Sequence, residues 1–274
     1  MLGDVTFGQY YNARSFLHKT DPRTKILLLI AYIVAVFLAQ NFLSLVAVLV
    51  FLIVAIIFSS VPLGSVLRSV KAIFFLILFM FVLNVLFHVR QEGETVYFWV
   101  ITKEGLISAS FLSARLILLV TGSSLLTLTT TPVSLTDGIE SLLKPLNLVK
   151  FPVHDLALVM SIALRFIPTL ANETDRIISA QKARGADFES GNIFSRIKAL
   201  VPVLIPLIIS ALRRADELGD AMDARCYTGS KNRTKYKKLT FTFRDIVATL
   251  FVAALITGVV LLNVYYAQIV AVIF

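Results

Sequence analysis

The sequence predicts an all-α integral membrane protein with about five transmembrane helices, and with a cytoplasmic region of long amphipathic helices inserted before the last span. Three observations predict this class. The 274-residue chain is 57% hydrophobic and 16% charged, with a mean hydropathy of +0.84, whereas soluble domains are about 45–50% apolar and about 25% charged. The apolar residues gather in runs of about 20 residues, the length that crosses a bilayer. A long stretch rich in charge separates the last run from the others.

The same composition excludes a soluble globular protein and a disordered chain. The net charge of +9 is weak evidence for nucleic acid, because Lys and Arg in a membrane protein mark its cytoplasmic side. A single cysteine, Cys226, excludes a disulfide framework and a cysteine-cluster metal site. Met1–Lys25 contains no apolar core, so no cleavable signal peptide is expected.

Residues 1–131 are predicted to form a membrane domain of four spans. Asp21 is a good N-cap, and Pro22 suits the first position of a helix. The pair Gln40-Asn41 interrupts a run too long for one span, so we expect a tight hairpin of two. Arg115 lies inside the fourth span, where we favour a structural contact with an interface or a partner helix. The four predicted spans are Ile26–Ala39, Phe42–Phe58, Val70–Phe87 and Gly105–Thr131.

Residues 132–245 are predicted to form a cytoplasmic domain of amphipathic helices. A short helix with Leu135, Ile139, Leu142 and Leu143 on one face ends at Pro145. Two long helices follow: Val153–Arg184, with a kink expected at Pro168, and Ile193–Arg225, with Pro202 and Pro206 near its start. A basic linker, Lys231–Lys238, then leads to the final span, 246–274.

Two apolar stretches in this region, Leu156–Ala171 and Ala199–Leu212, resemble short spans. If either crossed the membrane, a basic segment would be displaced to the outside, which the positive-inside rule opposes. We therefore expect both to be apolar faces of helices that lie under or partly in the bilayer. The N-terminus is predicted in the cytoplasm and the C-terminus outside.

The cytoplasmic region contains a short repeat with an offset of 41 residues. Ala180-Gln181-Lys182-Ala183-Arg184-Gly185 corresponds to Ala221-Met222-Asp223-Ala224-Arg225-Cys226. Helical spacing places the two alanines and the arginine of each copy on one face. Small residues let a helix end approach another surface closely, and an arginine at its edge can bind a carboxylate or carbonyls in a pocket. The alternative is ordinary helical sequence, since alanine favours helices and arginine suits a C-terminus.

These features resemble the transmembrane T component of energy-coupling factor importers, a family of bacterial uptake systems. Leu17–Lys25 is similar to the family's Asp-Pro-Arg-x-Lys entry into the first span. Ala183-Arg184-Gly185 and Ala224-Arg225-Cys226 are similar to its paired Ala-Arg-Gly signatures, although Cys226 replaces glycine. The resemblance covers essentially the whole chain.

The resemblance implies a coupling subunit in a bacterial cell membrane. Its partners would be two related ABC ATPase subunits, which bind the ATP, and a small membrane subunit that binds a vitamin or trace metal. No cofactor and no nucleic acid would bind this chain. Arg184 and Arg225 would each dock on one ATPase subunit, with their flanking residues Ala183, Gly185, Ala224 and Cys226. A tentative face for the substrate-binding subunit comprises Leu156, Val159, Met160, Ala163 and Ile167.

Two other functions remain open from the sequence. A self-contained permease would need polar groups inside the spans, for which Asn84, Arg115 and Asn263 are available. A membrane-embedded, lipid-modifying enzyme would need a carboxylate cluster at the interface. The acidic groups around Glu173 and Asp216 are interleaved with arginines, and we interpret them as solvated helix faces.

Overall fold

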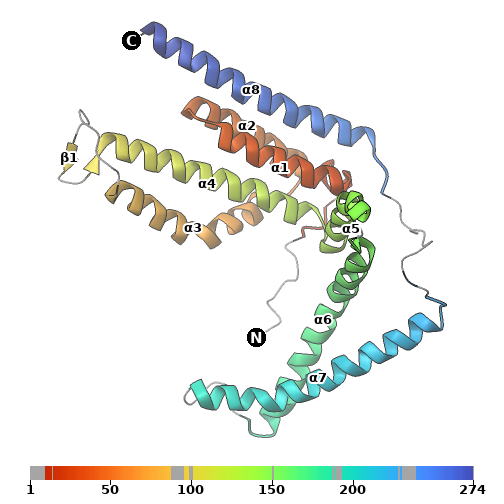
Figure 1. Cartoon of the computed structure of the whole chain (residues 1–274). Helices are drawn as coiled ribbons and strands as arrows, with labels where there is room; N and C mark the ends of the chain where they lie inside the picture. Colours follow the sequence, from red (N-terminus) through yellow and green to blue (C-terminus); the bar gives the residue numbers. More distant parts are fainter. Residues whose placement is uncertain are drawn as a thin grey trace. The chain divides into compact units, whose positions relative to one another are not determined.

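The fold is described from a computed structural model, which gives residues 10–13, 15–87, 96–98, 101–149, 151–186, 188, 193–227, 229 and 239–273. The predicted all-α class is confirmed, with one short antiparallel pair of strands (Figure 1). The helices are α1 Pro22–Leu38, α2 Phe42–Ser59, α3 Leu63–Leu86, α4 Lys103–Thr129, α5 Pro132–Leu143, α6 Val153–Ala183, α7 Ile193–Asp223 and α8 Phe243–Ile273. Two 3₁₀ helices, Leu17–Lys19 and Lys144–Val149, and the strands β1 Val96–Phe98 and β2 Ile101–Thr102 complete the described elements.

The chain divides into two compact units. One holds residues 139–238, and the other holds residues 8–138 together with 239–274. We call them the insert unit and the membrane unit. The predicted cytoplasmic segment, 132–245, is seven residues longer than the insert unit at each end.

Most predicted helices lie within a few residues of the observed ones. Asp21 caps α1 as predicted, because its carboxylate accepts the amide N–H of Arg23 at 2.9 Å. The prediction for the third span was too short, since α3 begins at Leu63, seven residues before the predicted start at Val70. The strands β1 and β2 lie between the third and fourth predicted spans. Pro168 does not interrupt α6.

Five of the described helices are long and apolar enough to cross a membrane: α2, α3, α4, α6 and α8. The predicted number is confirmed, but the set differs from the prediction. α1 has 17 residues, or about 26 Å, slightly less than a hydrocarbon core of about 30 Å. α6 joins the set because its first half is apolar over a sufficient length.

Small side chains bring the helices of the membrane unit together. Ala35 and Val36 of α1, Val48 of α2 and Val259 of α8 are completely buried, as expected for close packing of membrane helices. α8 packs along α1 and α2, and α3 packs along α4 (Figure 1). Large apolar side chains on the outer surface of α3, including Phe74, Phe75 and Phe79, are exposed and suit contact with lipid.

α1 and α8 run in the same direction and are joined at both ends. At one end, the backbone N–H of Asp21 donates to the Asp245 carboxylate at 2.8 Å. At the other end, Asn263 Nδ2 donates to the Leu38 carbonyl at 2.7 Å. Arg115 contacts this second end from α4, where its guanidinium donates to the Ala39 carbonyl at 2.5 Å and lies over the Phe111 ring. Arg115 and Asn263 therefore bind the turn between α1 and α2, and the structural interpretation of Arg115 is confirmed.

Candidate functional site

The two arginine signatures lie at the C-terminal ends of the long helices of the insert unit. α6 ends at Ala183 and α7 ends at Asp223, so Arg184 is the first residue after α6 and Arg225 is the second residue after α7. Both arginines are exposed, as are the alanines that share their faces. The sequence prediction that each helix ends at its arginine is therefore confirmed.

The backbone closes each helix end in the same way. After α6, the N–H of Gly185 donates to the Lys182 carbonyl at 3.0 Å, and the N–H of Ala186 donates to the Gln181 carbonyl at 3.0 Å. This pair of bonds defines a Schellman motif with Arg184 as the C-cap. Gly185 has a φ of +88°, the left-handed conformation that this motif requires.

α7 ends with the same pair of bonds, shifted by 41 residues. The N–H of Cys226 donates to the Asp223 carbonyl at 2.9 Å, and the N–H of Tyr227 donates to the Met222 carbonyl at 3.0 Å. Cys226 adopts a φ of +55° although it has a side chain. The replacement of glycine by Cys226 therefore does not change how the helix ends, and the repeat is a repeat of structure as well as of sequence.

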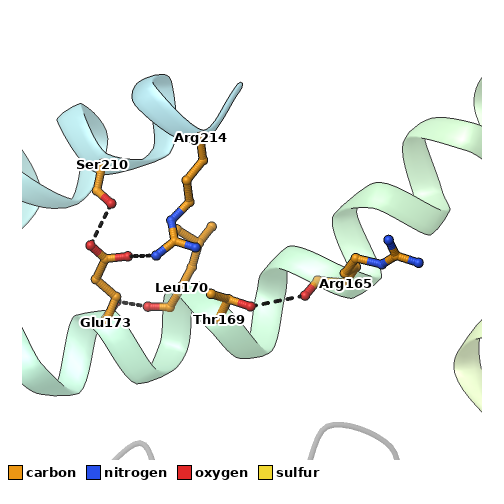
Figure 2. Close-up of polar contacts among 7 residues, drawn as sticks. Arg165, Thr169, Leu170, Glu173, Ser210 and Arg214 are labelled. Carbon is orange, nitrogen blue, oxygen red and sulfur yellow. Dashed lines mark hydrogen bonds and ion pairs between the residues drawn. The ribbon is translucent and has the colours of Figure 1, made fainter. Parts of the chain in front are cut away.

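α6 and α7 cross, and a small polar cluster joins them at the crossing (Figure 1). Glu173 on α6 accepts two bonds from α7: Ser210 Oγ donates to Oε1 at 2.6 Å, and Arg214 Nη2 donates to Oε2 at 2.5 Å (Figure 2). We call these three residues the crossing cluster. The prediction that Glu173 belongs to a solvated helix face is wrong, because Glu173 is half-buried and bonds the neighbouring helix.

The crossing cluster also favours the ionised form of Glu173. A span of about 20 residues that begins at Val153 ends at Asn172, so Glu173 lies outside it. The hydrogen bond from Ser210 and the guanidinium of Arg214 favour the ionised carboxylate and hold the pKa of Glu173 below its ordinary value. Ionised Glu173 and Arg214 therefore form a charge-assisted pair at the crossing.

A second bond joins the two helices closer to the end of α6. Pro206 has no backbone N–H, so the carbonyl four residues earlier, at Pro202, has no donor within α7. Gln181 Nε2 donates to that carbonyl at 3.3 Å. Gln181 belongs to the first arginine signature, whereas the equivalent residue in the second is Met222. Because Pro206 cannot donate to the Pro202 carbonyl, that carbonyl is available to bind Gln181 near the end of α6.

The apolar face predicted for a substrate-binding subunit is open in the insert unit. Leu156, Val159, Met160 and Ile167 are exposed, and Ala163 is half-buried. α7 exposes a second apolar row at helical spacing, most of which lies in the stretch Ala199–Leu212 that the sequence predicted as an apolar helix face. The residues of that row are Ile197, Leu200, Val201, Leu204, Ile205, Ile208, Ile209 and Leu212. Their i, i+3, i+4 spacing is the pattern typical of such a face.

The described residues give little support to a metal site, since no three His, Cys, Asp or Glu side chains among them gather closely enough to hold a metal ion. The site consists instead of two similar, exposed helix ends and the crossing that joins them. Such ends can contact other proteins through a flat alanine surface and a charged guanidinium.

Known proteins similar to this chain are membrane transport proteins. The family model CbiQ, described as a cobalt transport protein, matches residues 13–236. A Clostridium kluyveri protein is 46% identical over 98% of this chain and 100% of its own length. A Brevibacillus brevis protein is 49% identical over 93% of this chain and 97% of its own, and a Bacillus subtilis protein is 44% identical over 93% and 98%. All three are named energy-coupling factor transporter transmembrane protein EcfT.

Proposed function

Because this chain belongs to the EcfT family, the transmembrane components of energy-coupling factor transporters, we propose that it couples two cytoplasmic ATPase subunits to a substrate-binding membrane subunit. The chain itself is a multi-pass membrane protein and a subunit of a larger transporter. In the proposal it carries no catalytic residue. ATP hydrolysis by the two partners reorients the small membrane subunit, which delivers a vitamin or a trace metal.

The observation that carries this proposal is the equivalence of the two helix ends. Arg184 and Arg225 occupy the same C-cap position of the same motif, 41 residues apart. Two equivalent ends suit two related subunits that offer similar grooves. The ends are similar but not identical, since Gln181 and Gly185 correspond to Met222 and Cys226. We expect the two ATPases to differ slightly from each other in the grooves that bind these ends.

The chemistry of docking follows from the exposed residues. The alanines on each end leave room for a groove wall to approach the helix closely, and the arginine reaches beyond them with five donors in a rigid fork. A carboxylate or a set of carbonyls at the base of the groove would bind this fork. Truncation of such a buried, hydrogen-bonded charge costs about 2–5 kcal/mol.

The arrangement of α6 and α7 suits the transmission of motion. Arg184 follows Glu173 by eleven residues, and Arg225 follows Arg214 by eleven residues, so each arm extends about 16 Å beyond the crossing. If ATP binding changes the distance between the two docked ends, the helices rotate about the crossing cluster. The exposed apolar faces of α6 and α7 then move with them, and we assign these faces to the substrate-binding subunit.

We also propose the orientation of the membrane unit, with the N-terminus in the cytoplasm and the C-terminus outside. α1, α2, α3, α4 and α8 alternate in direction, so the start of α1, the end of α4 and the start of α8 lie at the same end. Arg23, Lys25 and Arg244 are at that end, which supports a cytoplasmic location under the positive-inside rule.

Affinity purification tests the proposed partners. The tagged chain is extracted from its native membrane in a mild detergent, and every co-purifying chain is identified by mass spectrometry. We expect two related ATPases and at least one small hydrophobic protein. A chain that purifies alone under progressively gentler extraction, and that transports a substrate alone in proteoliposomes, contradicts the proposal and favours a self-contained permease.

A further inference from the structure

The membrane unit contains a buried polar cluster that none of the proposed docking contacts use. It joins three helices: Asp21 and Lys25 at the start of α1, Thr129 and Thr130 at the end of α4, and Asp245 near the start of α8. We call these residues the anchor cluster. Lys25 Nζ donates to the Thr129 carbonyl at 3.0 Å and to Thr130 Oγ1 at 3.1 Å. Asp245 accepts the N–H of Asp21 at 2.8 Å and the N–H of Thr242 at 2.7 Å.

The charges in the anchor cluster are almost completely removed from solvent. Asp21 is 6% exposed, Lys25 is 8% exposed and Asp245 is 2% exposed. Hydrogen bonds hold Lys25 to the end of α4, and they hold Asp245 to the first turn of α1. Buried charges are costly unless they are paired and hydrogen-bonded, and removal of one partner leaves the others uncompensated. The cluster therefore resists any separation of the three helix ends.

The position of this cluster in the chain is unusual. Residues 139–238 form a unit of their own, so the chain leaves the membrane unit after Gly138, eight residues beyond Thr130, and returns to it at Leu239, six residues before Asp245. Near the outgoing connection, Thr130 is bonded to Lys25. Near the returning connection, Asp245 is bonded to Asp21. Both connections are therefore attached close to the first turn of α1. Sequence separation explains why this arrangement was not predicted, since Asp21 and Asp245 lie 224 residues apart.

The opposite end of the same helix pair provides a contrast. Asn263 also joins α8 to α1, through the Leu38 carbonyl, about 27 Å along α8 from Asp245. That contact involves no charge, and it lies at the end of the membrane unit away from both connections. A comparison of variants at these two contacts therefore distinguishes a general effect on helix packing from an effect on the connections to the insert unit.

We propose that Lys25 and Asp245 are positioning residues for energy coupling. The anchor cluster holds the outgoing and returning connections at one fixed point, so that force on the insert unit moves the membrane helices together. Without the cluster, the ends of α4 and α8 would separate and absorb the motion. This inference rests on the proposed coupling function and extends it to residues outside the docking ends.

The test compares Lys25→Met, Asp245→Asn and Thr130→Val with the matched control Asn263→Leu. Each variant is purified as the complete complex, reconstituted in proteoliposomes and assayed for substrate uptake and ATP hydrolysis. The readout is the uptake per ATP hydrolysed, with both activities measured on the same purified complex. We expect the ratio to fall at least tenfold in Lys25→Met and Asp245→Asn and two- to threefold in Thr130→Val. We expect Asn263→Leu to remain within twofold of the unmodified complex.

If Lys25→Met fails to assemble, the milder Asp245→Asn and Thr130→Val variants decide the question. An unchanged ratio in the assembled anchor variants, beside an unmodified complex that works, overturns the anchor alone. An equal loss in Asn263→Leu also overturns it, because the effect would then belong to helix packing in general. Absence of ATP-driven uptake in the unmodified complex contradicts the coupling function and with it the anchor.

Discussion

Glu173 and Arg214 are the same position of a 41-residue repeat, and they bind each other where α6 and α7 cross. The helix ends at Arg184 and Arg225 follow Glu173 and Arg214 by eleven residues each, so they lie at equal distances along the chain from the crossing. Each end therefore has an arm of the same length.

The ion pair is expected to fix the crossing more than it stabilises the chain. An ion pair that is partly exposed contributes about 0.2–1 kcal/mol, so Glu173→Gln should change the unfolding midpoint little. We expect it to loosen the crossing, which spin labels at the equivalent positions 179 and 220 would report as a broader distance distribution. The free Cys226 is replaced by glycine in every labelled protein. An unchanged width in Glu173→Gln contradicts this prediction, and the exchange Glu173→Arg with Arg214→Glu should restore a narrow distribution.

The same label pair should reveal a pH dependence. The bond from Ser210 and the charge of Arg214 lower the pKa of Glu173 from its ordinary value of 4.5. A lowered pKa means that the contribution of this carboxylate is fully present above pH 4.5 and is lost as the pH falls through the lowered value. We expect the distance distribution to broaden only in that acidic range. Glu173→Gln serves as the control and should show no such transition.

Cys226→Gly should stabilise the end of α7. The residue holds a φ of +55°, a conformation that costs an L-residue about 1–2 kcal/mol and costs glycine little. We expect a slower amide exchange at Tyr227, whose N–H closes the motif, and normal uptake. Gly185→Ala, at the equivalent position of α6 with a φ of +88°, should have the opposite effect on the amide of Ala186. Faster exchange after Cys226→Gly is the contrary result.

Gly122 is expected to be intolerant of any side chain. A Cβ atom there would lie 2.2 Å from the Tyr32 ring, which is buried and held by a bond from its hydroxyl to the Leu118 carbonyl at 2.9 Å. Overpacking of this kind costs about 1–3 kcal/mol, so Gly122→Ala should lower the midpoint of thermal unfolding in detergent. Gly258→Ala is the matched control, since nothing lies within 4 Å of a Cβ at that position. Similar midpoints for the two variants would contradict the assigned packing.

Local signals in the sequence predicted the parts of this fold that depend on neighbouring residues. The Asp21 cap, the tight turn after Leu38 and the two helix ends at Arg184 and Arg225 follow from short patterns. The exposed alanines of the repeat were found in the same way. The docking role of those ends stays a prediction.

Contacts between distant residues could not be predicted in the same way. Nothing in the local sequence of Glu173 distinguishes a solvated carboxylate from one that bonds Ser210 and Arg214. The 41-residue offset of the repeat also relates Glu173 to Arg214, but the contact between them depends on how α6 and α7 cross. The sequence of the apolar half of α6 is equally compatible with a membrane span and with the apolar face of an amphipathic helix. The two differ in what surrounds the helix more than in their composition.

The central claim is that the two arginine ends dock on ATPase subunits, and the double variant Arg184→Ala with Arg225→Ala tests it most directly. Each truncation is expected to weaken docking by about 2–5 kcal/mol, so the double variant should lose both co-purification with the ATPases and ATP-driven uptake. Arg213→Ala removes the same charge from an exposed position on α7 away from its end and should leave both intact. A double variant that retains its ATPases and transports normally would contradict the account.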